Sequence, residues 1–100
     1  MMVTVFRSRL RPEHVEEYQQ LAPRMRALAE SMPGFVSAKT FTAADGERVS
    51  IEEFESPETL EAWRNHPEHR EAQRLGREKF YSEFHVQVCR VEREYDMPPR

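Results

Sequence analysis

The sequence predicts an α+β domain of the ferredoxin-like class, in which a four-stranded antiparallel sheet carries helices on one face. Four segments are rich in β-branched and aromatic residues, and the segments between them carry apolar residues at helical spacing. The resulting order is strand, helix, strand, strand, helix pair, strand, which this fold accommodates with short connections. At 100 residues the chain can form one modest core. We therefore predict a single domain over residues 1–96 and a loose C-terminal tail over residues 97–100.

The first strand is predicted from Met2 to Leu10, where apolar side chains fall on both faces of the alternating pattern. A helix should follow from Pro12 to Met32, because apolar residues recur there at steps of three and four. Pro23 is expected to kink this helix, since proline has no N–H to donate to the preceding turn. Pro33-Gly34 should end it, with the glycine in the left-handed conformation.

Three further strands are predicted. The segments Phe35 to Thr42 and Arg48 to Glu55 flank an Asp45-Gly46 pair that is typical of a β-hairpin, so they should pair antiparallel. The last strand is predicted from Phe84 to Tyr95. It contains Cys89, the only cysteine of the chain, whose apolar neighbours indicate a buried and unreactive thiol.

Two short helices are predicted between the hairpin and the last strand. Ser56-Pro57 is a typical helix start, because serine caps free N–H groups and proline suits the first helical position. Pro67 should end this helix and begin a second one, which places His66 at the corner between them. Because glycine is unfavourable inside a helix, Gly76 should mark a close packing contact. It belongs to one helical stripe with His69, Ala72, Gln73 and Phe80.

The helices can cover only one face of the predicted sheet. Apolar side chains on the other face would be exposed in a monomer, and a second sheet packed against them would remove them from water. We therefore expect a homodimer joined sheet against sheet. The apolar side chains concerned are one of the sets Phe35/Phe41 or Val36/Ala38, together with Val49/Ile51 or Phe54.

The composition excludes some classes of partner. The chain has 18 acidic and 15 basic residues without a basic cluster, which argues against nucleic-acid binding. It has no apolar stretch long enough to span a membrane, and its first residues lack the apolar region of a secretory signal. We therefore predict a cytoplasmic protein without a membrane partner.

Several motifs resemble a known family. The string FTAADGERVSIEEFES, followed by WRNHPEHREAQRLGREKFYSEFHVQVC, resembles the antibiotic biosynthesis monooxygenase-like family of dimeric α/β-barrel proteins, and the turn Pro33-Gly34-Phe35-Val36 does so too. The resemblance implies a dimeric barrel with a pocket between sheet and helices in each subunit. The better-known enzymes of this family oxidise electron-rich polycyclic phenols to quinones with O₂, without a metal or a flavin.

Such chemistry needs a base to form the phenolate, donors that hold the ring oxygens, and a dry cavity. His66 and His69 are the candidate catalytic bases, because an unperturbed histidine pKa of about 6.5 suits proton transfer. The resemblance places Trp63 in a position similar to that of the family's pocket tryptophan. The candidate substrate-binding residues are Trp63, Gln73, Tyr81, Arg77 and Tyr18.

No metal and no cofactor are predicted. His66 and His69 have no third ligand nearby in the sequence, and Pro67 lies between them. The haem-degrading branch of the superfamily has a haem-ligating histidine about where this chain has Gln73, and an asparagine in the first strand that is absent here. These differences argue against haem chemistry.

The leading functional hypothesis is a cofactor-independent monooxygenase that acts on a small aromatic compound of phenolic or polyketide-like character. One alternative is a non-catalytic dimeric module that binds a small hydrophobic ligand. Another is an isomerase or decarboxylase built on the same barrel. The sequence leaves open whether the protein is catalytic at all, and it does not identify the ligand.

Overall fold

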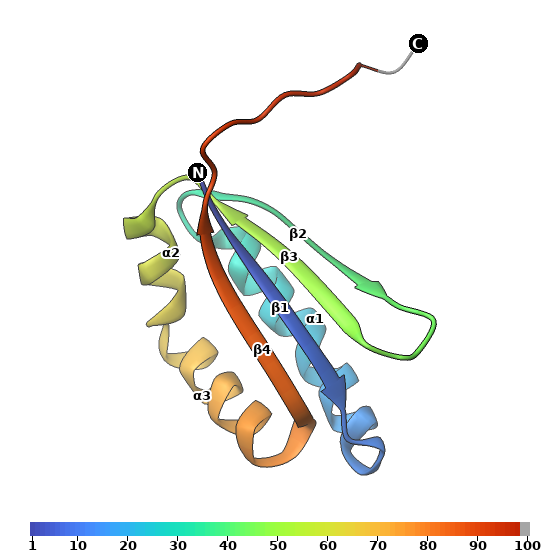
Figure 1. Cartoon of the computed structure of the whole chain (residues 1–100). Helices are drawn as coiled ribbons and strands as arrows, with labels where there is room; N and C mark the ends of the chain where they lie inside the picture. Colours follow the sequence, from blue (N-terminus) through green and yellow to red (C-terminus); the bar gives the residue numbers. More distant parts are fainter. Residues whose placement is uncertain (99–100) are drawn as a thin grey trace.

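The computed structural model describes residues 1–98 and has four antiparallel strands with helices packed against the sheet (Figure 1). This is the predicted ferredoxin-like α+β fold. The strand order in the sheet is β2-β3-β1-β4, so the first strand of the chain is a central one. The elements are β1 (Met2–Leu10), the 3₁₀ turn η1 (Pro12–His14), α1 (Val15–Ser31), β2 (Phe35–Thr42), β3 (Arg48–Phe54), α2 (Pro57–Arg64), α3 (Pro67–Leu75), the π-helical turn η2 (Gly76–Phe80) and β4 (Tyr81–Arg90).

The register of β1 with its neighbours divides the sheet into two faces. Thr4 lies opposite Glu52 in β3 and Val88 in β4, and residues that lie opposite one another point to the same side. We call the face that carries these three residues the inner face, because it lies toward the helices. The outer face carries the alternate side chains, among them Val3, Val5, Phe41, Val49 and Ile51.

The core lies at one end of the inner face. Its buried members are Ala29 of α1, Phe54 of β3, and Leu60 and Trp63 of α2. Phe54 has no exposed surface, and the ring of Phe35 meets it edge to face at 5.7 Å between centroids. The core therefore fixes α1 and α2 to the end of the sheet at which β3 finishes.

The predicted bounds of the last strand are wrong. The strand begins at Tyr81 rather than Phe84 and ends at Arg90 rather than Tyr95. It ends there because β4 runs alongside β1, and after Arg90 pairs with Met2 only one further backbone bond, from Val91 N–H to Met1 O, joins the two segments. Residues 91–98 form no regular element and lead away from the sheet (Figure 1). Of the predicted tail, positions 99 and 100 lie outside the described residues.

The helical segments differ from the prediction in detail. The first begins as η1 and becomes α-helical at Val15, and α1 continues through Pro23, whose expected kink stays a prediction. The second helix of the pair ends at Leu75 and is followed by η2, a distinction that apolar spacing does not reveal. The close contact expected at Gly76 is confirmed, because a Cβ there would lie 2.8 Å from Cε2 of Tyr81.

The outer face is open to solvent in the single chain. Phe41 and Ile51 expose 49% and 38% of their surface, which identifies Phe41 with Val49 and Ile51 as the apolar set of this face. Cys89, opposite Val3, is exposed as well, so the prediction of a buried thiol is wrong for the isolated chain. The helices cannot shield it because they lie on the other side. Within residues 1–98 no helix is long and apolar enough to cross a membrane.

Two glycines with positive φ allow a test of packing around the turns. Gly34 has φ +82° and Gly46 has φ +92°, but a Cβ at Gly34 would lie 2.5 Å from the Thr59 side chain, whereas at Gly46 the nearest atom is 3.9 Å away. Both alanine variants should lose about 1 kcal/mol of unfolding free energy from backbone strain. Gly34→Ala should lose about 1–3 kcal/mol more, because Thr59 must move. Urea denaturation measures both losses, and equal losses would show that the Thr59 contact has no effect.

Candidate functional site

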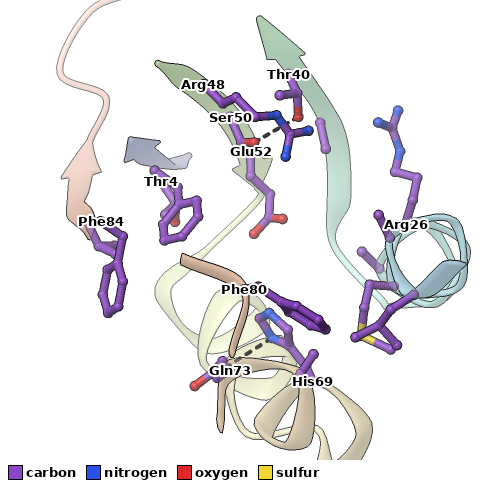
Figure 2. Close-up of a pocket in the computed structure, with 18 of the residues that line it drawn as sticks. Thr4, Arg26, Thr40, Arg48, Ser50, Glu52, His69, Gln73, Phe80 and Phe84 are labelled. Carbon is purple, nitrogen blue, oxygen red and sulfur yellow. Dashed lines mark hydrogen bonds between the residues drawn. The ribbon is translucent and has the colours of Figure 1, made fainter. Parts of the chain in front are cut away.

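A cavity of about 790 Å³ lies between the inner face of the sheet and helices α1, α2 and α3. Its lining comes from all four strands as well as from the helices. This volume is in the range of sites that bind small organic molecules. Most of the lining surface is apolar, and polar side chains from the sheet and from α3, among them Arg48, Glu52 and His69, also line the space (Figure 2).

The centre of the site is a stacked pair formed by Trp63 and His69. Trp63 is 2% exposed, near the end of α2, and the imidazole of His69 lies parallel to it, with 4.0 Å between ring centroids and 9° between planes. The corner at Pro67 makes this possible, because proline cannot donate the hydrogen bond that would continue α2. The second helix can therefore change direction and place His69 over the indole ring.

The hydrogen bonds of His69 determine which ring nitrogen can act as a base. Nδ1 lies 3.1 Å from the carbonyl oxygen of Trp63 and 3.3 Å from Nε2 of Gln73. A carbonyl can only accept, so the shorter contact places a proton on Nδ1 and leaves the lone pair on Nε2. In this tautomer Nδ1 does not accept from Gln73, whose Nε2 donates to the Arg64 carbonyl instead. Burial lowers the pKa of His69, and the hydrogen bond to the Trp63 carbonyl opposes this effect only in part. His69 is thus neutral at pH 7 and can accept a proton at Nε2.

His66, the other candidate base, is not among the residues that line the cavity. Its extended backbone precedes α3, and its Nδ1 accepts a hydrogen bond of 3.2 Å from the backbone N–H of Glu68. The imidazole therefore caps the first turn of α3, a position that proline at the next residue favours. His66 therefore stabilises the corner between α2 and α3, whereas His69 lines the cavity.

The other predicted site residues, Gln73, Tyr81, Arg77 and Tyr18, all line the cavity together with Trp63 and His69. Gln73 donates from Nε2 to the carbonyl oxygen of Arg64 at 3.1 Å, which links α3 to the end of α2. Arg77 is exposed and lies at the margin of the site. The structure places these residues together, but it assigns them no chemical role.

One end of the cavity is aromatic. The ring of Tyr81 lies 5.2 Å from that of Phe6 and 6.1 Å from those of Tyr18 and Phe84, all edge to face. The guanidinium of Arg48 lies over the Tyr18 ring, 4.8 Å from its centroid. Burial, reinforced by Tyr18, raises the pKa of the Tyr81 phenol above its ordinary value. Tyr81 therefore remains a neutral hydroxyl that can donate a hydrogen bond.

Glu52 is a site residue that the sequence analysis missed. It lies on the inner face of β3 and projects from the sheet toward the helix that carries His69 (Figure 2). Burial raises the pKa of its carboxyl group, and the Trp63 indole and Arg26 only partly oppose this effect. The available signal was the alternation Arg48, Ser50, Glu52, Phe54, which places a carboxylate on the same face as a core phenylalanine.

Two polar atoms beside Glu52 have no hydrogen-bond partner among the described residues. They are the hydroxyl oxygen of Thr4 and the indole nitrogen of Trp63, and both are buried. The Trp63 N–H lies close enough to the Glu52 carboxylate to lower its pKa, although the contact does not have the geometry of a regular hydrogen bond. Within residues 1–98 no three His, Cys, Asp or Glu side chains are placed to hold a metal ion.

Comparison with known proteins identifies the family. The profile described as antibiotic biosynthesis monooxygenase matches residues 1–75, three quarters of the chain. The chain belongs to this family. It is also 32% identical over 87 residues to the uncharacterized protein YqjZ of Bacillus subtilis (strain 168), a match that covers 87% of this chain and 76% of YqjZ.

Solved structures have the same fold as this antibiotic biosynthesis monooxygenase family member. Rv0793 from Mycobacterium tuberculosis matches with a TM-score of 0.82 and 22% identity, over 95% of this chain and 98% of Rv0793. A variant of SnoaB, a cofactor-independent oxygenase from Streptomyces nogalater, matches with a TM-score of 0.77 and 15% identity, over 93% and 94% of the two chains. At these identities the likeness concerns the fold alone.

The raised pKa of Glu52 predicts how the free energy of unfolding depends on pH. Because the folded chain binds this proton more tightly than the unfolded chain does, ionisation of Glu52 lowers stability as the pH rises from the unfolded pKa through the folded pKa. Glu52→Gln should therefore be more stable than the wild type at about pH 7.5, and the difference should vanish below about pH 4. Thermal unfolding across this pH range measures the effect. The exposed Glu55, outside the cavity, provides the control Glu55→Gln, and an equal gain there would contradict the assignment.

Proposed function

We propose that the protein is a cofactor-independent oxygenase that converts a small phenolic aromatic compound to a quinone inside this cavity. The observation that carries the proposal is the orientation of His69, which is stacked on Trp63 and hydrogen-bonded through Nδ1, so that Nε2 is available as a base. Membership of the antibiotic biosynthesis monooxygenase family supports the reaction class. The volume and the aromatic lining of the cavity support the substrate class.

The chain's own residues account for the requirements of such a reaction. Nε2 of His69 takes the phenolic proton and makes the ring electron-rich enough to react with O₂. The neutral hydroxyl of Tyr81 donates a hydrogen bond to a ring oxygen, and the apolar and aromatic side chains of the lining pack against the substrate ring. One oxygen atom enters the ring and the other leaves as water, while the substrate loses two hydrogens. The substrate itself therefore supplies both electrons and both hydrogens for the water, and no further reductant is needed.

A comparison of the two histidines tests this proposal. His69→Asn removes the base and should lower O₂ consumption with a dihydroxynaphthalene by about 10²- to 10⁴-fold. His66→Asn should retain wild-type turnover, because asparagine is also a good helix cap and His66 lies outside the cavity lining. An oxygen electrode measures turnover, with a protein-free blank and with thermal unfolding of each variant as the control for folding.

Two outcomes would contradict the proposal. Turnover by His69→Asn at the wild-type rate would remove His69 from the mechanism. Binding of the naphthalene without O₂ consumption by the wild type would favour a non-catalytic module that binds a small ligand, because the cavity would then be a binding site without chemistry.

We also propose that two copies of the chain pair through their outer faces. Exposed apolar side chains on this face, such as Phe41 and Ile51, support this proposal, because a second sheet would remove them from water. The charges at the edge of the face support it as well. Arg7 is paired with Glu47 and Arg9 with Asp45, so these arginines would not strongly repel the same arginines of a second copy. The resemblance to dimeric barrel proteins agrees with this arrangement.

A charge placed in the outer face tests the pairing. Ile51→Lys should convert a dimer of about twice 11.9 kDa into a monomer, because burying an unpaired ammonium group is unfavourable. Sedimentation equilibrium at micromolar concentration measures the mass. Arg70→Gln, an exposed change on α3, serves as the control. A monomeric wild type, or a dimeric Ile51→Lys, would contradict the proposed interface.

A further inference from the structure

We propose that Arg48 forms a subsite on the sheet wall of the cavity that binds a carboxylate group of the ligand. This inference rests on the proposed function and narrows its substrate class to phenolic aromatic acids. Arg48 projects from β3 on the sheet side of the cavity, whereas the candidate base His69 lies on the helix side (Figure 2). A ring system between the sheet and the helices can therefore meet the two residues at different edges.

The first argument is the charge of the cavity lining. The whole chain has 18 acidic and 15 basic residues, so its net charge is negative. Within residues 1–98, however, the cavity is lined by a single acidic side chain, Glu52, and by five basic ones, which are Arg26, Lys39, Arg48, Arg64 and Arg77. A cavity with this excess of positive charge favours an anionic ligand.

The second argument is that Arg48 has no ion pair in the described part of the chain. Two other arginines of the lining do have one, since Arg26 pairs with Glu30 at 3.5 Å and Arg64 pairs with Glu61 at 3.6 Å. Arg48 is half-buried, and a positive charge that is partly removed from water without a partner is unfavourable. An anionic ligand supplies the opposite charge.

The third argument is the setting of the Arg48 side chain. Its neighbours across the sheet, Thr42 and Ser8, are uncharged. The ring of Tyr18 in α1 holds the guanidinium at 4.8 Å from the ring centroid, a contact that uses no acceptor oxygen. Glu52 shares the inner face, but four residues of strand separate it from Arg48 by about 13 Å along β3. The guanidinium is therefore held at the cavity with donors left for a ligand.

The fourth argument is chemical complementarity. The planar guanidinium donates two parallel hydrogen bonds to the two oxygens of a carboxylate, and the two charges neutralise each other. A neutral amide of the same shape offers only one acceptor oxygen. Arg77 is also positively charged, but it is exposed at the margin of the cavity, where water solvates it. Arg48 therefore selects the carboxylate, and Arg77 adds only a general attraction.

Two ligands of the same shape test this subsite. Isothermal titration calorimetry at about pH 7.5 compares β-naphthoate, which is ionised, with β-naphthamide, which is neutral. The wild type should bind the naphthoate about tenfold or more tightly, as expected for hydrogen bonds between charged groups. Arg48→Gln should reduce this preference to about threefold or less, with the affinity for the amide nearly unchanged, because the substitution removes only the cation.

Three further variants make the assignment specific to Arg48. Arg70→Gln makes the same change of charge on α3, outside the cavity, and should keep the wild-type preference. Arg77→Gln should keep most of it. Arg48→Lys retains the charge without the planar fork, so its preference should exceed that of Arg48→Gln. Thermal unfolding shows whether each variant is folded.

Several results would overturn the subsite. They are equal affinities of the two ligands for the wild type, and no binding of the naphthoate at millimolar concentration. An unchanged preference in Arg48→Gln, or a loss of preference in Arg77→Gln alone, would overturn it too. So would an Arg48→Lys variant with no more preference than Arg48→Gln.

Oxygen consumption separates this inference from the proposed function. A wild type that prefers the naphthoate but consumes no O₂ with a dihydroxynaphthalene or a dihydroxynaphthoate would support the subsite and contradict the oxygenase proposal. Turnover without a preference for the naphthoate would do the reverse. The binding experiment needs no catalysis, so each proposal can fail alone.

Discussion

The corner at His66 and Pro67 is the constraint on which the site depends. A continuous helix would carry the residues after Trp63 past the indole ring, but Pro67 cannot continue the hydrogen bonding of α2. The chain turns instead, His66 caps the new helix, and His69 returns over Trp63. Gln73 secures the bend through its bond to the Arg64 carbonyl. Trp63 is therefore both a core residue and the ring on which the candidate base His69 stacks.

The inner face of the sheet explains why so small a domain retains a cavity. The row formed by Met2, Phe54 and Phe35 is apolar and packs against α1 and α2. The next row carries Thr4 and Glu52, which cannot pack in the same way because their polar atoms would lose their hydrogen bonds to water. The helices therefore pack directly on the apolar row, and the cavity lies between the helices and the row of Thr4 and Glu52. The polar residues that weaken the core are the same ones that form the site.

Most of the fold was predictable from the sequence, because apolar spacing and the turn residues around Gly34, Gly46 and Pro67 specify the elements locally. The site was predictable only in part. The stripe of His69 and Gln73 follows from helical geometry, and both residues line the cavity. Glu52 was missed because both faces of the predicted strands carry apolar residues, so alternation alone could not tell which face lies toward the helices. The capping role of His66 and the exposure of Cys89 likewise depend on how the elements pack, which local patterns do not encode.

The contact between Gly76 and Tyr81 links two positions on either side of the joint between η2 and β4. A side chain at position 76 would occupy the space of the phenol ring, and that ring forms part of the cavity wall. Arg11 also holds this joint, with its backbone N–H on the Phe80 carbonyl at 2.7 Å and its Nε on the Tyr81 carbonyl at 3.0 Å. The backbone here has little freedom to shift, so the volume at position 76 must be balanced by the volume at position 81. In related chains these two positions should therefore covary, and a larger residue at position 76 should accompany a smaller residue at position 81.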